Sequence, residues 1–343
     1  MNVQVSIGLP TRNSIQFLSQ RLESIRQQTF GGWELIVVDS DSTDGTREML
    51  DELAAEDARV RVYQAPKDGI YSNFNRCIQL ANEPFVYIAT SDDTMAPDCL
   101  EKMVDALLQN PDCDLAHCPM RVLDRTGGSG PDWWAGNSLF AKSSGNLLEV
   151  KHKRVAPIDG ILCLLGDTIY TSVTQLLIKR SLFEKIGYYQ PDWDSLGDFH
   201  WNLRAGLFAS TVHVPDTWGG WRMHPGQATA NIRIGSVDHQ AKIDEMIADV
   251  LGQLDRYIEN EKQSQALELL LARAAKLRTD LRLQASHTAI SDRRIFLMRE
   301  AIMGRRHAWQ HFATTPPEQK SGARAALEEV RSWFDCEKLI ALS

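Results

Sequence analysis

The sequence has no apolar run of the roughly 18–20 residues that a membrane-spanning helix needs. Its six cysteines form no CxxC pair and no disulfide-framework spacing, which indicates reduced and mostly buried thiols. The opening residues, MNVQVSIGLP, are too short and too strand-like for a secretory signal peptide. The formal net charge of −8 argues against non-specific binding to nucleic acid. We therefore expect a cytoplasmic protein that does not bind nucleic acid.

Motifs of several common enzyme classes are also missing. No GxGxxG follows the first expected strand, so a dinucleotide-dependent redox site is not supported. No GxxxxGK[ST] phosphate loop and no HExxH zinc motif occurs, and GGSGP lacks the second spaced glycine of a nucleophile elbow. A Gly-rich loop with Arg or Lys, which nucleotidyl transfer would favour, is missing after the same strand. Among the enzyme sites considered, the one that the sequence still allows uses carboxylates with a hard metal ion.

The first hundred residues alternate between strand-like and helix-like patterns. Apolar runs typical of buried parallel strands are followed by segments with apolar residues at helical spacing. The expected strands cover residues 3–9, 34–39, 60–64 and 85–90, and the expected helices cover 14–28, 42–57, 71–81 and 97–109. This order predicts an α/β fold with an open parallel sheet covered by helices.

Polar residues follow each of the four expected strands. They are PTRN (10–13), DSDSTDGT (39–46), KDGIY (67–71) and SDDT (91–94). Ligands of such sheets bind beyond the carboxyl ends of the strands, where these four segments are expected to meet. A turn explains any one segment alone, but four on the same rim favour a binding site.

Asp92 and Asp93 end a buried strand, where unpaired charges are costly to desolvate. Paired carboxylates suit Mg²⁺ or Mn²⁺, which prefer oxygen ligands and can bridge a diphosphate. A capping turn before Pro97 is the structural alternative.

Two other carboxylates have candidate roles. Asp39 is placed to accept hydrogen bonds from a base or ribose, or it caps a turn. Asp198 lies in an expected helix that is otherwise apolar and aromatic, which makes it a candidate general base. An N-cap role, or an ion pair with Arg204, is the alternative for Asp198.

Several of these segments together resemble a known family. The segments VSIGLPTRN, QQTFGGWELIVVDSDSTDGT, KDGIYSNFNRCIQLA, FVYIATSDDTMAPDCL and SLGDFHWNLRAG are similar to family 2 inverting glycosyltransferases of the GT-A fold. The resemblance covers residues 3 to about 230. It implies a Rossmann-like, mostly parallel sheet within a domain of residues 1–235. Residues 1–120 would form the nucleotide-sugar half and 121–235 the acceptor and catalytic-base half.

The resemblance also implies roles for individual residues. The nucleotide would be bound by Pro10, Thr11, Arg12, Asp39, Asp41 and Asp68. The family's DxD motif reads SDD here, which implies Asp93 as a direct metal ligand and Asp92 as a ribose, diphosphate or metal contact. His224 would touch the metal or the diphosphate. Asp198 would be the catalytic base, although the frequent Glu before it is Gly197 here.

The function implied is metal-dependent, inverting transfer of a sugar from a nucleoside-diphosphate sugar, with UDP expected and Mn²⁺ or Mg²⁺ as cofactor. The acceptor would be a hydroxyl of a glycan or lipid-linked molecule in bacterial surface polysaccharide or lipopolysaccharide synthesis. Two alternatives stay open, a non-catalytic nucleotide-sugar-binding scaffold and a sugar nucleotidyltransferase.

Residues 236–343 lie outside the resemblance and have helical periodicity, which predicts a C-terminal α-helical extension. Within it, residues 264–311 hold nine Arg or Lys against four Asp or Glu. A solvated helix face explains this excess. The alternatives are peripheral contact with the inner face of a membrane, with an anionic acceptor or with another subunit of a homo-oligomer.

Overall fold

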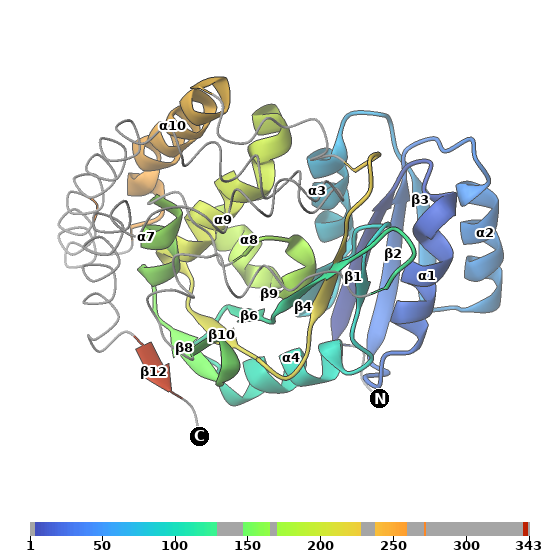
Figure 1. Cartoon of the computed structure of the whole chain (residues 1–343), viewed down its shortest axis with the longest axis horizontal. Helices are drawn as coiled ribbons and strands as arrows, with labels where there is room; N and C mark the ends of the chain where they lie inside the picture. Colours follow the sequence, from blue (N-terminus) through green and yellow to red (C-terminus); the bar gives the residue numbers. More distant parts are fainter. Residues whose placement is uncertain are drawn as a thin grey trace, which may run out of the picture.

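The computed structural model describes residues 4–128, 147–164, 170–227, 237–258, 271 and 339–341. Nine strands of these residues form the main sheet (Figure 1), in the spatial order β12-β8-β10-β6-β9-β4-β1-β2-β3. The N-terminal strands are parallel: β1 (Val5–Thr11), β2 (Trp33–Asp39), β3 (Val60–Gln64) and β4 (Phe85–Ile88). The helices of this half are α1 (Ile15–Arg26), α2 (Thr46–Glu56), α3 (Ile70–Leu80) and α4 (Cys99–Gln109). The α/β fold predicted from the sequence is confirmed.

The other half of the sheet is mixed. Its strands are β6 (Leu115–His117), β8 (His152–Arg154), β9 (Leu176–Lys179), β10 (Thr211–His213) and β12 (Leu339–Ala341). β9 lies between β4 and β6 and is antiparallel to both, and β8 is antiparallel to β10 and β12. β9 starts at the rim where the parallel strands end, directly after the turn Val173–Gln175, so it must run against its neighbours.

A small second sheet joins three segments that are distant in sequence. Its order is β5 (Thr94–Met95), β11 (Gly219–Arg222) and β7 (Met120–Leu123). β11 is antiparallel to β5 and parallel to β7. This sheet brings the end of β11 to the SDD segment after β4.

Helices cover both faces of the main sheet (Figure 1). Phe85 and Tyr87 of β4 pack with the face that α1, α2 and α4 cover. Val86 and Ile88 pack with the opposite face, which α3, α8 (Arg180–Ile186) and α9 (Gly197–Phe208) cover. This alternation is the strand periodicity of two, with both faces buried.

Part of the C-terminal extension shares this core. α10 (Val237–Gly252) buries Met246 and Val250 in the same apolar cluster as Trp201 of α9. β12 adds an edge strand to the sheet where the sequence pattern predicts helix. The basic segment 264–311 lies outside the described residues, apart from residue 271. The remaining short elements are α7 (Ile158–Leu164) and 3-10 turns at Leu147–Glu149, Pro191–Leu196 and Leu254–Arg256.

Candidate active site

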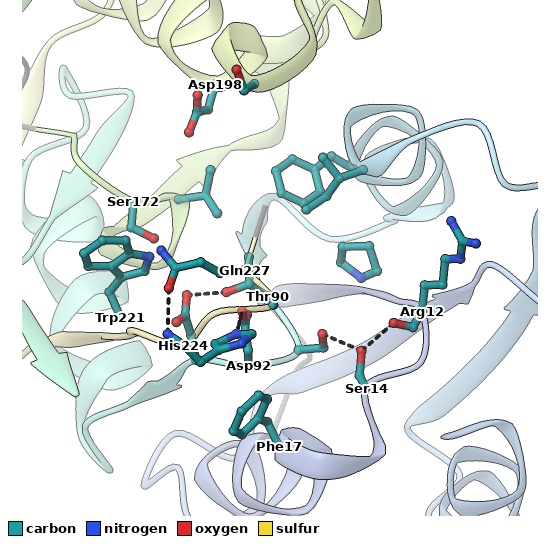
Figure 2. A pocket seen from close by; sticks show the side chains of 18 of the residues that line it. Arg12, Ser14, Phe17, Thr90, Asp92, Ser172, Asp198, Trp221, His224 and Gln227 are labelled. Atoms are coloured by element: carbon teal, nitrogen blue, oxygen red, sulfur yellow. Dashed lines mark hydrogen bonds and ion pairs between the residues drawn. The ribbon is translucent and has the colours of Figure 1, made fainter. Parts of the chain in front are cut away.

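A cavity of about 560 Å³ opens at the carboxyl ends of β1 and β4 (Figure 2). Its lining comes from the loops after both strands, from α3 and α9, and from β11 with the loop that follows. Of the residues singled out in the sequence, it brings together Pro10, Arg12, Asp92, Asp93, Asp198 and His224. The remaining four, Thr11, Asp39, Asp41 and Asp68, lie outside this lining.

Asp92 and His224 form a contact across 132 residues of sequence. Asp92 Oδ2 and His224 Nε2 are 2.9 Å apart (Figure 2), and the histidine ring packs on Phe17 with ring centroids 4.6 Å apart. The His224 amide donates to Gln227 Oε1 at 2.9 Å, which anchors the loop after β11. A carboxylate and an imidazole are thus held together at one end of the cavity.

The Asp92 and His224 pair fits a divalent ion. Ligands at about 2.1 Å from an octahedral ion, and adjacent on it, lie about 3.0 Å apart, close to the separation of Oδ2 and Nε2. No cluster of three or more candidate protein ligands occurs among the described residues. Mg²⁺ is commonly held by one or two carboxylates plus substrate phosphates, so a smaller donor set fits this chemistry.

Asp93 is buried beside this pair. Its Oδ1 accepts the Arg222 amide hydrogen at 2.8 Å, and its Oδ2 accepts the Thr90 hydroxyl. Burial, reinforced by the neighbouring Asp92 charge, raises the pKa of Asp93 to about 7. Protonation of Asp93 is therefore sensitive to any cation that enters the cavity.

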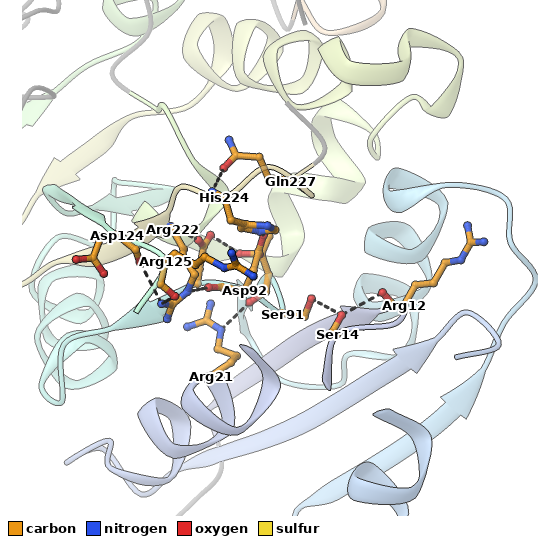
Figure 3. Close-up of polar contacts among 12 residues, drawn as sticks. Arg12, Ser14, Arg21, Ser91, Asp92, Asp124, Arg125, Arg222, His224 and Gln227 are labelled. Carbon is orange, nitrogen blue, oxygen red and sulfur yellow. Dashed lines mark hydrogen bonds and ion pairs between the residues drawn. The ribbon is translucent and has the colours of Figure 1, made fainter. Parts of the chain in front are cut away.

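Two buried arginines hold the SDD segment, and the sequence analysis did not identify either. Arg222 Nε donates to the Asp92 carbonyl at 2.6 Å, and its terminal nitrogens reach Gln20 Oε1 at 2.6 Å and the loop after β7 (Figure 3). Arg21 Nε donates to the Thr90 carbonyl at 2.9 Å. A signal for Arg21 exists in the sequence, because it occupies the apolar face of α1 between Leu18 and Leu22.

Asp39 ends β2 and is buried. Its Oδ1 accepts hydrogen bonds from the Thr11 hydroxyl at 3.0 Å and from the Ser42 hydroxyl, and its Oδ2 accepts the Ser42 amide hydrogen at 3.1 Å. Thr11 and Asp39 are register partners on adjacent strands. These contacts fix the carboxylate at the strand rim beside the cavity.

Asp41 and Asp68 occupy the same rim farther from the cavity. Asp41 has a positive φ of 56° and pairs with Lys67 Nζ at 2.9 Å, which lowers the pKa of Asp41. Asp68 accepts hydrogen bonds from both terminal nitrogens of Arg76, which lower the pKa of Asp68. Both carboxylates are therefore ionised and exposed.

Asp198 lies in the first turn of α9, on the side of the cavity opposite Asp92 and His224 (Figure 2). Burial raises the pKa of Asp198, and two nearby groups oppose that rise: the Phe199 amide, which donates to Oδ1 at 2.7 Å, and the Tyr71 hydroxyl. Leu196 occupies the N-cap position, and Arg204 donates to the carbonyls of Ile186 and Tyr188. Neither the N-cap nor the Arg204 ion pair accounts for Asp198.

The chain was compared with known proteins. Residues 6–187, more than half of the chain, match the sequence model of Glycosyl transferase family 2. A putative teichuronic acid biosynthesis glycosyltransferase, TuaG of Bacillus subtilis, is 31% identical over 106 residues, which are 31% of this chain and 42% of TuaG. Glycosyltransferase GlyG of Streptococcus pneumoniae is 32% identical over 116 residues, covering 34% of this chain and 38% of GlyG. The matches span less than half of these relatives.

Solved structures share the fold over almost the whole chain. S. aureus TarS 1–349 in complex with UDP-GlcNAc superposes with a TM-score of 0.58 and 18% identity, covering 96% of this chain and 90% of TarS 1–349. The mannosyltransferase PcManGT from Pyrobaculum calidifontis, in complex with GDP-Man and Mn²⁺, gives a TM-score of 0.54 at 17% identity, covering 98% and 87%. At such identities the likeness concerns the fold, and both the resemblance and the fold class expected from the sequence are confirmed. With its GT-A fold and its family match over residues 6–187, the chain belongs to glycosyl transferase family 2.

Proposed function

We propose that the protein transfers a sugar from a nucleoside-diphosphate sugar to an acceptor hydroxyl, with inversion at the anomeric carbon. The observation that carries this proposal is the opposition of two groups across one cavity, Asp92 with His224 on one side and Asp198 on the other. A donor held at the first group would present its anomeric carbon toward the second.

UDP is the proposed nucleotide, and a glycan or lipid-linked hydroxyl in bacterial surface polysaccharide synthesis is the proposed acceptor. TarS was solved with UDP-GlcNAc, and TuaG is named for teichuronic acid biosynthesis. Chondroitin synthase of Escherichia coli, another relative, is 30% identical over 123 residues.

The donor would bind along the rim of the parallel strands. Asp39 would accept a hydrogen bond from the base, and Asp41 and Asp68 would extend that surface. Pro10 and Arg12 would line the pocket between the base and the diphosphate, and Thr11 would hold Asp39 in place through its hydroxyl. The cation of Arg12 and the ionised Asp41 and Asp68 give this rim mixed charge, which suits a ligand with both phosphate oxygens and hydroxyl groups.

Asp92, Asp93 and His224 would hold Mn²⁺ or Mg²⁺. The chemistry supplied by such an ion is charge compensation on the departing diphosphate. Arg222 and Thr90 keep the Asp93 carboxylate in place through their hydrogen bonds. Asp93 would therefore need no large movement when a metal ion and the donor bind.

Asp198 would act on the acceptor. Its carboxylate would accept the proton of the attacking hydroxyl, as that oxygen approaches the anomeric carbon from the face opposite the diphosphate. A single displacement of this kind inverts the configuration. Because burial raises the pKa of Asp198, it is a stronger base than an exposed aspartate.

Contact with an anionic membrane surface through residues 264–311 is a further part of the proposal, resting on their charge alone. Among the described residues, no helix is long and apolar enough to cross a membrane. Co-sedimentation of the full chain with anionic and neutral vesicles tests this contact, and equal recovery with both would contradict it.

The experiment for the main proposal is calorimetric titration with UDP, dTDP and GDP, each with Mn²⁺ and with EDTA, followed by a donor-sugar turnover assay. We expect one nucleotide to bind with Mn²⁺ only, and Asp92→Asn to lose that binding. Asp198→Asn should keep the binding and lower turnover by about 100-fold or more. Asp112→Asn, an exposed aspartate paired with Lys153, is the matched control and should behave as wild type.

Three results would contradict the proposal. Absence of binding for all three nucleotides would leave the family relationship as one of fold only. Binding without turnover of any donor would favour a non-catalytic nucleotide-sugar-binding protein. Pyrophosphate among the products would favour a nucleotidyltransferase.

A further inference from the structure

Tyr71 lies in the cavity that also contains the proposed base, Asp198. It is the second residue of α3, directly after the loop that carries Asp68, and it lines the cavity together with Asp198. Its side chain is 8% exposed, and its hydroxyl is near enough to the Asp198 carboxylate for each group to shift the pKa of the other. The sequence analysis assigned no role to Tyr71.

The position of the Tyr71 ring depends on Gly197. A Cβ atom at residue 197 would lie 2.6 Å from Cδ2 and Cε2 of the ring and 2.9 Å from its Cγ, closer than Cβ atoms pack in proteins. Any larger residue at 197, including the Glu that is frequent in the family, would therefore displace the ring. The Tyr71 ring can occupy its position only because residue 197 is glycine.

Aromatic neighbours fix the ring in this position. Tyr189 stacks on Tyr71 with centroids 5.9 Å apart and an interplanar angle of 19°. Phe74, one turn along α3, meets the ring edge-on with centroids 5.5 Å apart. With the ring held by Gly197, Tyr189 and Phe74, the hydroxyl oxygen has little positional freedom to lose when it binds a carboxylate.

We propose that Tyr71 is a positioning residue for the base: its hydroxyl donates a hydrogen bond to the Asp198 carboxylate, and Gly197 provides the space that its ring requires. This inference rests on the proposed role of Asp198 in the transfer reaction. The hydrogen bond orients the carboxylate toward the cavity and stabilises its ionised form, which is the form that accepts a proton.

The electrostatics agree with this role. Burial and the Asp198 charge raise the pKa of Tyr71, so the phenol stays protonated and acts as the donor. The hydrogen bond lowers the pKa of Asp198, against the rise caused by burial. Removing the hydroxyl must therefore shift the titration of Asp198 to higher pH.

Other ionisable groups near α9 either lack a hydrogen bond to Asp198 or have partners of their own. The Tyr189 hydroxyl interacts with the Asp198 charge but has no hydrogen-bond partner among the described residues. Four charged residues lie on the elements packed against α9. Asp194 lines the same cavity from the turn Pro191–Leu196, and Asp249 of α10 is bonded to His200. Asp159 of α7 is paired with Arg154, and Lys185 of α8 donates to the Phe208 carbonyl.

The test compares Tyr71→Phe with Tyr189→Phe. Each keeps its ring and loses one buried hydroxyl, but only the first loses the bond to Asp198. The protein is labelled with ¹³Cγ-aspartate, the Asp198 signal is identified by its loss in Asp198→Asn, and its titration is followed by NMR. We expect a midpoint about one pH unit higher in Tyr71→Phe than in wild type, and an unchanged midpoint in Tyr189→Phe. An unchanged midpoint in Tyr71→Phe, or equal shifts in both variants, would overturn the proposal.

Turnover provides a second measurement. In Tyr71→Phe we expect kcat to fall about tenfold, with the acidic limb of its pH profile at higher pH and donor KM unchanged. Gly197→Ala should reproduce the pH shift by displacing the ring. If wild type turns over no donor, the proposed function fails, whereas the NMR titration still decides the role of Tyr71. An active enzyme in which both variants keep the wild-type pH profile would refute the inference alone.

Discussion

Replacing Arg222 by lysine tests whether this buried guanidinium organises the end of the cavity that carries Asp92 and His224. Arg222 donates to four acceptors, the carbonyls of Asp92, Asp124 and Arg125 and the side chain of Gln20. A lysine ammonium is a single point and cannot reach acceptors on three segments at once. If one of the four bonds survives, three are lost at about 1 kcal/mol each, so we expect the free energy of unfolding to fall by about 3 kcal/mol.

Arg222→Lys should also weaken nucleotide binding in the presence of Mn²⁺, because the Asp92 main chain loses its anchor. Urea unfolding measures the stability change and calorimetry measures the binding. Arg121→Lys is the matched control, since Arg121 is an exposed arginine in the adjacent strand β7, paired in register with Gly220 and placed over the Trp218 ring. Equal unfolding free energies for the two variants, or full nucleotide affinity in Arg222→Lys, would refute the reasoning.

Three further outcomes follow from buried groups. In EDTA, the free energy of unfolding should fall as pH rises from about 4 toward 7. The reason is that folding raises the pKa of Asp93 from 3.8 to about 7, so over this range the carboxyl is ionised in the unfolded chain and protonated in the folded protein. Urea unfolding of Asp93→Asn should not show this decline. Gly206→Ala should destabilise the protein by about 1–3 kcal/mol, measured by thermal unfolding, because its Cβ would lie 2.4 Å from the Gly160 amide nitrogen where α7 meets α9. Asp159→Asn should lower the free energy of unfolding by about 3–5 kcal/mol, measured in urea, because it removes the ion-pair partner that lies 2.7 Å from the buried Arg154; an unchanged midpoint would contradict this account.

The N-terminal half of the fold could be predicted because its signals are local. The strands ending at Thr11 and Asp39 are mostly apolar runs, and the helices that follow them have apolar residues at regular spacing. β9 could not be predicted in its place, since nothing local distinguishes a strand that inserts antiparallel between β4 and β6. The turn at Val173–Gln175, whose side chains are buried, leads directly into β9 at that position.

The sequence identifies site residues that belong to one loop, but it does not identify residues that reach the site through contacts between distant segments. Asp92 and Asp93 stand out because two carboxylates end an apolar run. Arg222 and Tyr71 do not, because their surroundings depend on residues about 130 positions away: Arg222 bonds to the SDD segment, and the Tyr71 ring packs on Gly197 of α9. The assignments of the ten site residues remain predictions for the titrations above.

Ser91 explains how the SDD variant can coexist with the proposed chemistry. Its hydroxyl lies 2.8 Å from the hydroxyl of Ser14, the N-cap residue of α1 (Figure 3). A serine here ties the loop after β4 to the loop after β1, which carries Arg12. An aspartate would place a third carboxylate beside Asp92 and Asp93, where the pKa of Asp93 is already raised by burial and by its neighbour. His224 would instead complete the proposed group with a side chain that is neutral when deprotonated, so the proposed metal site would have less charge repulsion in the absence of a cation.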